Sequence, residues 1–480
     1  MKHLVHSAAM VAPLLAAGLL LSACAAWGPA AAPPVLVAKS ASTQFANAAT
    51  STSEPVAQFW QLFNDTTLNS LVDVALKQNT DLRVAVARVN EARALALGTD
   101  GLGRPTLGLG AGVSRSRTGD GSAAAVNANN LSVGLQGSWE IDLFGRINSE
   151  QRSAQALFLA SQAQQRAVQV SVVAEVARTY FELRGVQEQL RVASAALETQ
   201  TAALKIVDAR LTVGRGTAFD TERAKALVAA TAAAVPALDA VRVRAQLRLA
   251  TLMGLTPQAL PAGLMEAKPL PALPVTALAQ IGNPQSLLQR RPDVAAAEQQ
   301  LLATQAQSGV AQSALFPQLT LAGSLGLNAG RLADVLEPSA FVFNLGASLL
   351  WSLIDNGQRQ AQVGAAAARI DAAQATFDKA VLGALEDAES ALATYSRTQL
   401  QTDSLFTAAV AANRAAQIAR ARFAAGVSDF FAVLDAEREL LAAQDRLAVA
   451  QTQAATGLVG VYRALAGGWA VQEPQGTSLR

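Results

Sequence analysis

The sequence predicts a mixed α and β membrane protein built from a duplicated unit, with long coiled-coil helices and four transmembrane β-strands in each chain. Three observations support this fold class. The chain matches itself when it is shifted by 212 positions, and apolar residues follow a heptad spacing over two long stretches. In addition, four runs of about ten residues alternate between apolar and small or polar side chains, as membrane-spanning strands do.

The N-terminal segment has the form of a signal peptide, residues 1–23. A basic start at Lys2 is followed by the apolar run AAMVAPLLAAGLLL, which is too short to span a membrane as a helix. The sequence LSAC then ends on Cys24, the only cysteine of the chain, and resembles the lipobox of bacterial lipoproteins. We therefore expect Cys24 to be acylated and residues 24–55 to form a lipidated linker. An ordinary signal peptide cut near Ala23 is the alternative.

The body of the chain consists of two copies of one unit. The first copy covers residues 56–255 and the second covers 285–467, with the proline-rich linker 256–284 between them and a tail at 468–480. The matched pairs are Asp81 and Asp293, Pro105 and Pro317, Trp139 and Trp351, Gly145 and Gly357, Gly214 and Gly426, and Phe219 and Phe431. After these pairs the best match shifts to 213 positions, for example Leu227 with Leu440 and Gly254 with Gly467, which predicts one inserted residue in the second copy.

Each copy contains a long helix with a coiled-coil seam. In the first copy the helix begins after the sequence DLFGR and runs to about Arg210. Its seam positions follow 3-4-3-4 steps and are Leu183, Val186, Leu190, Ala193, Leu197, Gln200, Leu204, Val207 and Leu211. The second copy repeats these steps from Val433 to Val461, with many small residues that permit close helix approach. A helix over residues 147–213 would be roughly 100 Å long at ~1.5 Å per residue, which an ordinary core helix, the alternative, does not need.

The four alternating runs form two hairpins, at residues 105–141 and 317–353. Each strand has one apolar face, and Trp139 and Trp351 each end a strand next to a long helix, where an interfacial aromatic residue belongs. Soluble hairpins packed on the helices are the alternative. Four strands cannot close a barrel, and an open sheet edge is not tolerated in lipid. If these strands span a membrane, several chains must share them, and three chains would supply twelve strands.

Composition excludes several kinds of active site. Both histidines, His3 and His6, lie in the signal peptide, so the mature chain lacks His-dependent catalytic triads and His/Cys metal sites. The glycine-rich run GLGRPTLGLGAG has no Lys-Ser/Thr ending and reads as a strand rather than a phosphate-binding loop. With 38 basic and 36 acidic residues and no basic run, nucleic-acid binding is not indicated.

Taken together, the lipobox, the duplicated unit, the PxLxL strand starts and the strand-to-helix turns WEIDLFGR and WSLIDNGQR resemble the outer-membrane factor family, the TolC-like exit ducts of tripartite efflux pumps. The segment ARFAAGVSDFFAVLDAERELLAAQ adds to this resemblance, which is specifically to the lipoprotein branch often called NodT-type. The resemblance implies a homotrimer with a twelve-stranded outer-membrane barrel and a long periplasmic helical tunnel. It also implies a periplasmic adaptor protein, an inner-membrane transporter, passive transport of small molecules, and no cofactor.

The family places the periplasmic entrance at the two helix-to-helix tips, residues 210–224 and 422–438. Gly214 and Gly426 supply the freedom that a sharp turn needs. By resemblance, Asp435 in the sequence VLDAE carries the acidic ring of the narrowest point, whereas the second acidic position of TolC is Ala432 here. The further candidates at this periplasmic gate are Asp429, Phe430 and Phe431. For both carboxylates, a solvated tip residue is the alternative.

Three other functions were weighed against a small-molecule exit duct. The first is the outer-membrane component of a polypeptide secretion system, which would have the same architecture. The second is a structural periplasmic coiled-coil lipoprotein without a channel, which would not need the four alternating strands. The third is an enzyme, which the missing histidines and thiols of the mature chain disfavour. The sequence does not identify the transported substrate.

Overall fold

The structure, a computed structural model of the chain, describes residues 44–46, 56–118, 126–274 and 281–466. These residues belong to two compact units, and each unit takes segments from both copies of the repeat. The first unit contains residues 88–162 and 296–378, and the second contains the described residues of 36–87, 163–295 and 379–480. The predicted signal peptide, Cys24 and the tail at 468–480 lie outside the described residues.

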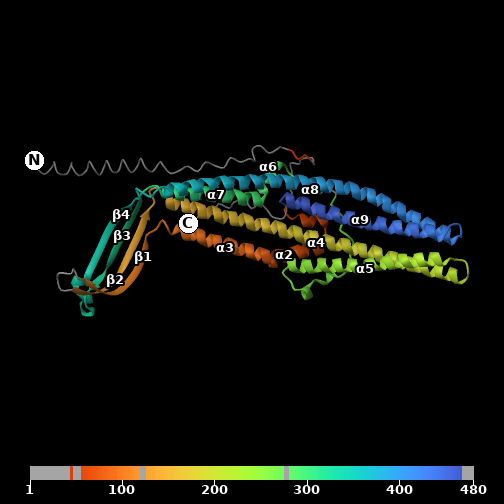
Figure 1. Cartoon of the computed structure of the whole chain (residues 1–480), viewed down its shortest axis with the longest axis horizontal. Helices are drawn as coiled ribbons and strands as arrows, with labels where there is room; N and C mark the ends of the chain where they lie inside the picture. Colours follow the sequence, from red (N-terminus) through yellow and green to blue (C-terminus); the bar gives the residue numbers. More distant parts are fainter. Residues whose placement is uncertain (1–43, 47–55, 119–125, 275–280, 467–480) are drawn as a thin grey trace, which may run out of the picture. The chain divides into compact units, whose positions relative to one another are not determined.

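The first unit contains a single antiparallel sheet in the order β1-β2-β3-β4 (Figure 1). Its strands are β1 (Thr106–Thr118), β2 (Val126–Ile141), β3 (Gln318–Ala329) and β4 (Phe341–Leu350). The strands of the first hairpin are longer than the predicted runs of about ten residues, because β1 has 13 residues and β2 has 16. Since β2 pairs with β3, the two hairpins join into one four-stranded sheet whose edges are β1 and β4.

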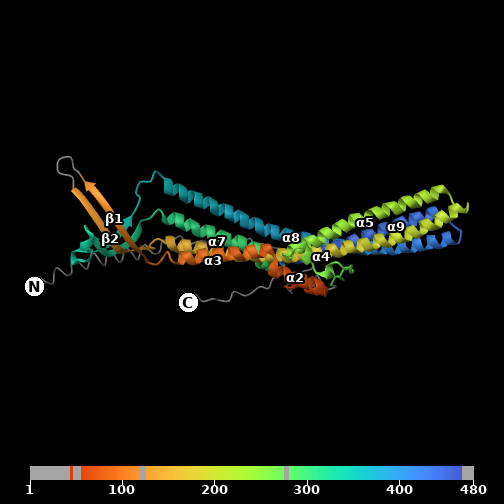
Figure 2. The same cartoon turned by 90° about the horizontal axis from the view of Figure 1, so that it is seen from below.

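The long helices repeat with the same lengths. Helices α4 (Arg146–Thr212) and α8 (Gln358–Ala424) both have 67 residues, and α5 (Ala218–Leu252) and α9 (Phe430–Ala464) both have 35. Figures 1 and 2 show α4 beside α5, and α8 beside α9, up to the turns that join them. Helices α4 and α8 each continue from the first unit into the second.

These bounds correct the predicted insertion in the second copy. Helices α5 and α9 begin and end exactly one repeat of 212 positions apart, so no residue is inserted between them. The positive φ that follows each helix is at Gly254 (67°) and Ala466 (56°), again 212 positions apart, and not at Gly467. The expectation was wrong because both helices are rich in alanine and leucine, so a shift of one residue still aligns apolar residues with one another.

Shorter helices precede each hairpin and each long helix. In the first copy these are α2 (Thr66–Gln78) and α3 (Thr80–Asp100), and in the second they are α6 (Pro284–Arg290) and α7 (Pro292–Ser313). Side chains cap two of them, since Asp65 accepts hydrogen bonds from the first turn of α2 and Asn283 forms a capping box on α6. Four one-turn 3₁₀ segments lie within the linker and the β3–β4 connection; they are Pro257–Ala259, Ala262–Leu264, Leu332–Leu336 and Pro338–Ala340.

The coiled-coil seam of α4 is buried or half-buried at every predicted position from Leu183 to Leu211. Small residues allow the helices of the second unit to approach closely. A Cβ at Gly185 of α4 would lie 2.0 Å from the Thr452 hydroxyl of α9, so no side chain fits at that position. The prediction of paired long helices with small seam residues is therefore confirmed.

The main core of the second unit surrounds the middle of α4. Tyr180 and Phe181 of α4 pack with Phe59, which lies in the one-turn segment Phe59–Phe63, and with Tyr462 of α9. Burial raises the pKa of Tyr180 to about 12, helped by its hydrogen bond to Asp65. These contacts tie the N-terminal helices to both long-helix pairs and give the second unit a rigid centre.

Candidate functional site

The sheet of the first unit has two chemically different faces. Strand register places side chains of opposite residues on the same face, so the pairs Leu109–Leu135, Leu135–Leu325 and Leu325–Phe343 continue one row across all four strands. The apolar residues of this outward face include Leu107, Leu109, Ala111, Val113, Leu131, Val133, Leu135, Trp139, Leu319, Leu321, Leu325, Leu327, Phe341, Phe343, Leu345, Ala347 and Leu349. Many of them are strongly exposed, for example Leu107 at 74% and Leu345 at 83%. Such a surface requires lipid or another apolar partner.

The opposite face carries glycine and small polar residues. Most of its residues are Gly108, Gly110, Gly112, Ser132, Gly134, Gln136, Ser138, Thr320, Ala322, Ser324, Gly326, Asn328, Asn344, Gly346 and Ser348. Glu140, Val342 and Leu350 lie on the same face and are its larger or charged members. Gly134 and Gly326 lie opposite each other, and a Cβ at Gly326 would be 2.5 Å from the Val133 carbonyl oxygen. The backbones of β2 and β3 therefore need glycine at this pair, because a side chain on either residue would clash with the neighbouring strand. A hollow of about 310 Å³ opens on this face.

The two tryptophans are fixed in the same way in both hairpins. The Trp139 indole Nε1 donates to the Gly103 carbonyl at 3.0 Å, and the Trp351 Nε1 donates to the Leu315 carbonyl at 3.1 Å. Both acceptors lie just before the first strand of their hairpin, 212 positions apart. Trp139 is 38% exposed and Trp351 is 51% exposed. Both lie at the end of the outward apolar face that is next to the helices, as aromatic girdle residues do.

The helix tips of the second unit have matching turns. Gly214 and Gly426 adopt φ values of 72° and 73°, a conformation that side-chain-bearing residues rarely take. Thr217 caps α5, and Asp429 caps α9 by accepting a hydrogen bond from the Ala432 backbone N–H. The Asp429 carboxylate therefore stabilises the start of α9, and the side chain is exposed at the tip.

Two arginine–phenylalanine contacts connect the α4–α5 tip to the α8–α9 tip. The Arg210 guanidinium of α4 lies 4.0 Å from the ring centre of Phe423 on α8, and the Arg223 guanidinium of α5 lies 4.4 Å from the ring centre of Phe431 on α9. Arg210 also donates to the Phe423 carbonyl at 3.5 Å. We call these four residues the tip clasp. Both distances fall within the range of cation–π attraction. The clasp therefore holds the tip of the α4–α5 helix pair to the tip of the α8–α9 helix pair.

Of the predicted tip residues, Phe430 is buried and Phe431 is about half exposed. Phe430 packs against Phe423 at 5.2 Å between ring centres and belongs to a small core with Val207 and Val433. Asp435 is largely exposed, and its carboxylate accepts from Arg438 of the same helix at 3.1 Å. The arginine that balances Asp435 within the chain is thus Arg438.

A buried ion pair lies next to this tip and was not predicted. Glu437 of α9 is only 5% exposed and pairs with Arg420 of α8. Sequence reasoning placed Ala436 in the seam instead, because a charged residue was not expected there. Arg210, Arg223 and Arg420 were missed because their partners lie on another helix, up to 213 positions away, and no local pattern marks such pairs.

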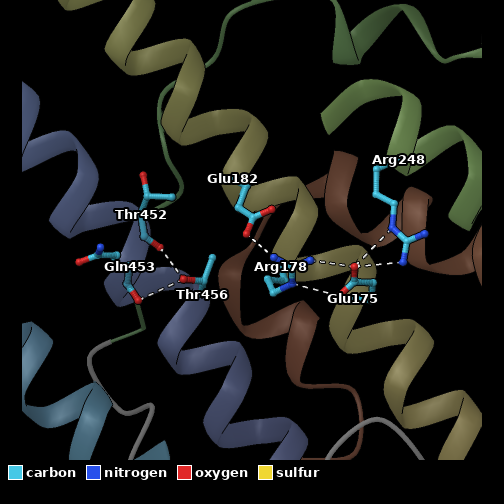
Figure 3. A network of polar contacts seen from close by, with 7 residues as sticks. All are labelled: Glu175, Arg178, Glu182, Arg248, Thr452, Gln453 and Thr456. Carbon is cyan, nitrogen blue, oxygen red and sulfur yellow. Dashed lines mark hydrogen bonds and ion pairs between the residues drawn. The ribbon is translucent and has the colours of Figure 1, made fainter. Parts of the chain in front are cut away.

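A second polar network joins α4 and α5 near the centre of the second unit (Figure 3). Arg178 donates to Glu175 at 2.8 Å and also to Glu182, while Arg248 of α5 lies 3.3 Å from Glu175. The hydrogen bond from Arg178 holds the pKa of Glu175 below its ordinary value. Arg178, Glu182 and Arg248 line a hollow of about 400 Å³, and Thr452 and Gln453 of α9 line it from the other side. The network thus holds α5 against α4 near the centre of the second unit.

The described residues contain no group of three or more His, Cys, Asp or Glu side chains that could hold a metal ion. The first unit thus has a sheet with an apolar face and a mostly polar face, and the second unit has long paired helices whose tips are held together by the tip clasp. These are the features of an outer-membrane channel protein.

Comparison with known proteins identifies the family. The family described as "Outer membrane efflux protein" matches residues 71–255 and again residues 283–467. The chain is 34% identical over 469 residues to the pyoverdine export outer membrane protein OpmQ of Pseudomonas aeruginosa, covering 95% of this chain and 96% of OpmQ. It is 27% identical to the cation efflux system protein CusC of Escherichia coli, covering 85% and 87% of the two chains.

Solved structures agree with these relatives. The outer-membrane channel OprN superposes with a TM-score of 0.84 at 38% identity, covering 92% of this chain and 98% of OprN. The Neisseria gonorrhoeae MtrE outer membrane channel in its open state gives a TM-score of 0.79 at 29% identity, covering 91% and 96%. The chain therefore belongs to the outer membrane efflux protein family. It is an outer-membrane efflux component with a periplasmic helical extension, and the resemblance noted from its sequence motifs is confirmed.

Proposed function

We propose that three copies of this chain form one passive efflux channel, with a twelve-stranded barrel in the outer membrane and a helical tunnel in the periplasm. The observation that carries this proposal is the sheet with an apolar face and two open edges, β1 and β4. An open edge leaves backbone groups without partners in lipid, so β4 of one copy must pair with β1 of the next. The helices also need neighbours, since the most apolar stretch of α5 is only 6% buried in the single chain.

The repeat predicts the register between copies. The β1–β2 and β3–β4 registers are related by the shift of 212, as Thr106–Ser138 and Gln318–Leu350 show. Applying the same shift to the β2–β3 pair Leu135–Leu325 sets Ala347 of one copy opposite Val113 of the next. Residues directly opposite in this way have Cβ atoms about 4.5–5.5 Å apart.

Cysteine cross-linking tests this assembly. The double variant Val113→Cys, Ala347→Cys should give covalent dimers and trimers on oxidation, and no larger species. The matched control Val113→Cys, Leu345→Cys lies on the same face but two residues out of register, so it should cross-link far less. The unsubstituted chain measures the contribution of Cys24. Ladders that continue beyond three chains, or equal cross-linking of both variants, would contradict the closed three-chain barrel.

The proposed cargo is a small molecule that an inner-membrane transporter delivers through a periplasmic adaptor protein. Named relatives export pyoverdine, solvents and cations, which supports small solutes as a class. Most of the water-facing side of the sheet carries neutral side chains, with the carboxylate of Glu140 at the end of β2 next to α4. This lining suits small solutes of varied chemistry. In this proposal the chain has no catalytic role and contributes a conduit.

The proposed gate is the tip of the helices, where the tip clasp keeps the α4–α5 and α8–α9 helix pairs of each chain together. Three copies of Asp435 would face one axis, and two carboxylates about 6 Å apart repel by about 3 kcal/mol at an effective dielectric near 20. Arg438 reduces this repulsion within each chain. Resting conductance should therefore be low and cation-preferring, and multivalent cations should block it from the periplasmic side.

Conductance of the purified protein in planar bilayers tests both the channel and the gate. Asp435→Ala should weaken the block by multivalent cations and raise resting conductance. Phe430 and Phe431 are proposed to resist opening by packing at this tip, and Asp429, whose carboxylate caps α9, is proposed to add negative charge at the same gate. If Asp435→Ala conducts and is blocked as the unmodified protein is, the constriction lies elsewhere. If no variant and no unmodified sample conducts, the channel proposal itself fails.

Membrane attachment through Cys24 completes the proposal. Mass spectrometry of the mature protein should find an acylated N-terminal Cys24 and none of residues 1–23. An unmodified Cys24, or cleavage at another position, would overturn it. Because the strands insert independently of the lipid, Cys24→Ser should impair maturation and still permit some insertion.

A further inference from the structure

The outward face of β1 changes abruptly from apolar to basic. Leu107, Leu109 and Val113 are 74%, 76% and 81% exposed on this face. The next two outward positions of the same strand are Arg115 and Arg117, and both side chains are exposed. The basic pair lies at the end of β1 that is farthest along the strand from the helices, next to the connection to β2.

Strand register fixes the direction of these two residues. Arg115 is opposite Asn129 and Arg117 is opposite Asn127, and both pairs continue the row of Val113 and Leu131. Ser114 and Ser116 alternate with them and therefore belong to the water-facing side. The arginines thus lie on the lipid side of the sheet, not in the channel.

Neither arginine has a carboxylate partner in the part of the chain that the structure describes. The register proposed between copies does not supply one either, because it sets Leu345 of the next copy opposite Arg115 and Phe343 opposite Arg117. An arginine beside such apolar side chains is costly unless its guanidinium reaches a polar layer. Its long side chain can extend along the sheet, parallel to the strand, toward the lipid headgroups.

We propose that Arg115 and Arg117 bind the phosphate groups of the phosphorylated lipid in the outer leaflet. The planar guanidinium matches phosphate oxygens with two parallel hydrogen bonds, and a headgroup phosphate is the anion that borders the apolar belt at this level. Two arginines two positions apart on one strand face project about 7 Å apart, which suits one diphosphorylated headgroup or two neighbouring ones. The pair fixes the depth of the barrel and recruits this lipid around it.

Binding of diphosphoryl lipid A by the purified protein in a neutral detergent tests the proposal. Each basic residue near a charged membrane surface contributes about 1 kcal/mol, so Arg115→Gln with Arg117→Gln should weaken the affinity about thirtyfold, or about 2 kcal/mol. Lipid A from which both phosphates have been removed should bind the unmodified protein as weakly as it binds the variant. Conductance in bilayers should be unchanged, which separates this surface from the channel and its gate.

A permuted variant is the matched control. Exchanging each arginine with the serine before it (Ser114→Arg, Arg115→Ser, Ser116→Arg, Arg117→Ser) keeps composition and net charge and turns both guanidinium groups to the water-facing side. This variant should lose affinity as the glutamine variant does. Equal binding by the permuted and unmodified proteins would overturn the proposal, since charge alone would then suffice. Weaker assembly of the glutamine variant with and without lipid A would also overturn it, because the arginines would then serve contacts between chains.

Discussion

Loss of the tip clasp should open the resting channel. Replacing Arg210 and Arg223 by methionine removes both guanidinium groups and keeps most of the aliphatic stem that packs on the helices. Each guanidinium lies within about 4.4 Å of its ring centre, and both arginines are half-buried. A cation–π contact of this kind contributes about 1 kcal/mol, between the values of exposed and desolvated pairs.

The expected effect follows from the number of contacts. Two contacts in each chain give about 2 kcal/mol per chain, and three chains that open together would lose about 6 kcal/mol of closed-state stabilisation. Since 1.4 kcal/mol is a factor of ten, the ratio of open to closed channels should rise by about 10⁴. If the chains open independently, the rise is about thirtyfold for each chain. Single-channel recording in planar bilayers measures this ratio directly.

A matched control and a variant of the partner residue show whether the effect comes from the clasp contacts. Arg422→Met removes an exposed arginine that stands at the same helix end and forms neither clasp contact, so it should leave the ratio unchanged. Phe431→Leu should open the channel as Arg223→Met does, and combining the two should add little, because both remove one contact. Full additivity of Arg223→Met and Phe431→Leu, or resting conductance of the double arginine variant equal to the unmodified protein, would refute the clasp.

Three further predictions concern stability. Leu321→Arg on the lipid face should cost on the order of 2–4 kcal/mol and reduce the heat-resistant oligomer on gels, while Ala322→Arg on the water face should assemble normally. Gln200→Leu should raise the midpoint temperature of thermal unfolding, measured by circular dichroism of the helices. Gln200 is only 3% exposed, and neither its amide nitrogen nor its amide oxygen has a hydrogen-bond partner in the described part of the chain. Burial opposes ionisation of Asp293, but hydrogen bonds from Arg291 outweigh it and hold the pKa of this carboxyl below its ordinary value. The stability from this pair is therefore full above the unfolded-state pKa and is lost as pH falls through the folded one, and Asp293→Asn should remove that acid-dependent part.

The elements of this protein could be derived from its sequence because each depends on a local pattern. In a strand, successive side chains point to opposite faces, so the alternation from Leu319 to Leu327 already assigns one face to lipid. In a helix, the 3-4 spacing from Leu183 to Leu211 already defines one seam. The shift of 212 carries the strand pattern and the glycine turns into the second half of the chain, since those turns need a conformation that other residues avoid. The second seam, from Val433 to Val461, is not related to the first by this shift and lies on the shorter helix α9.

The contacts between elements required the tertiary structure. Whether Arg210 meets Phe423, or Glu437 is buried against Arg420, depends on the angle and rotation with which two helices pack, and sequence periodicity leaves both open. The single offset of 212 emerged only from helix ends, since alanine-rich seams align equally well one residue out of register. Likewise, Asp429 and Asp435 look alike in sequence, but backbone geometry makes one a helix cap and leaves the other exposed at the tip. Local side-chain direction is encoded by neighbouring residues, whereas partner choice is a property of how whole helices and strands pack.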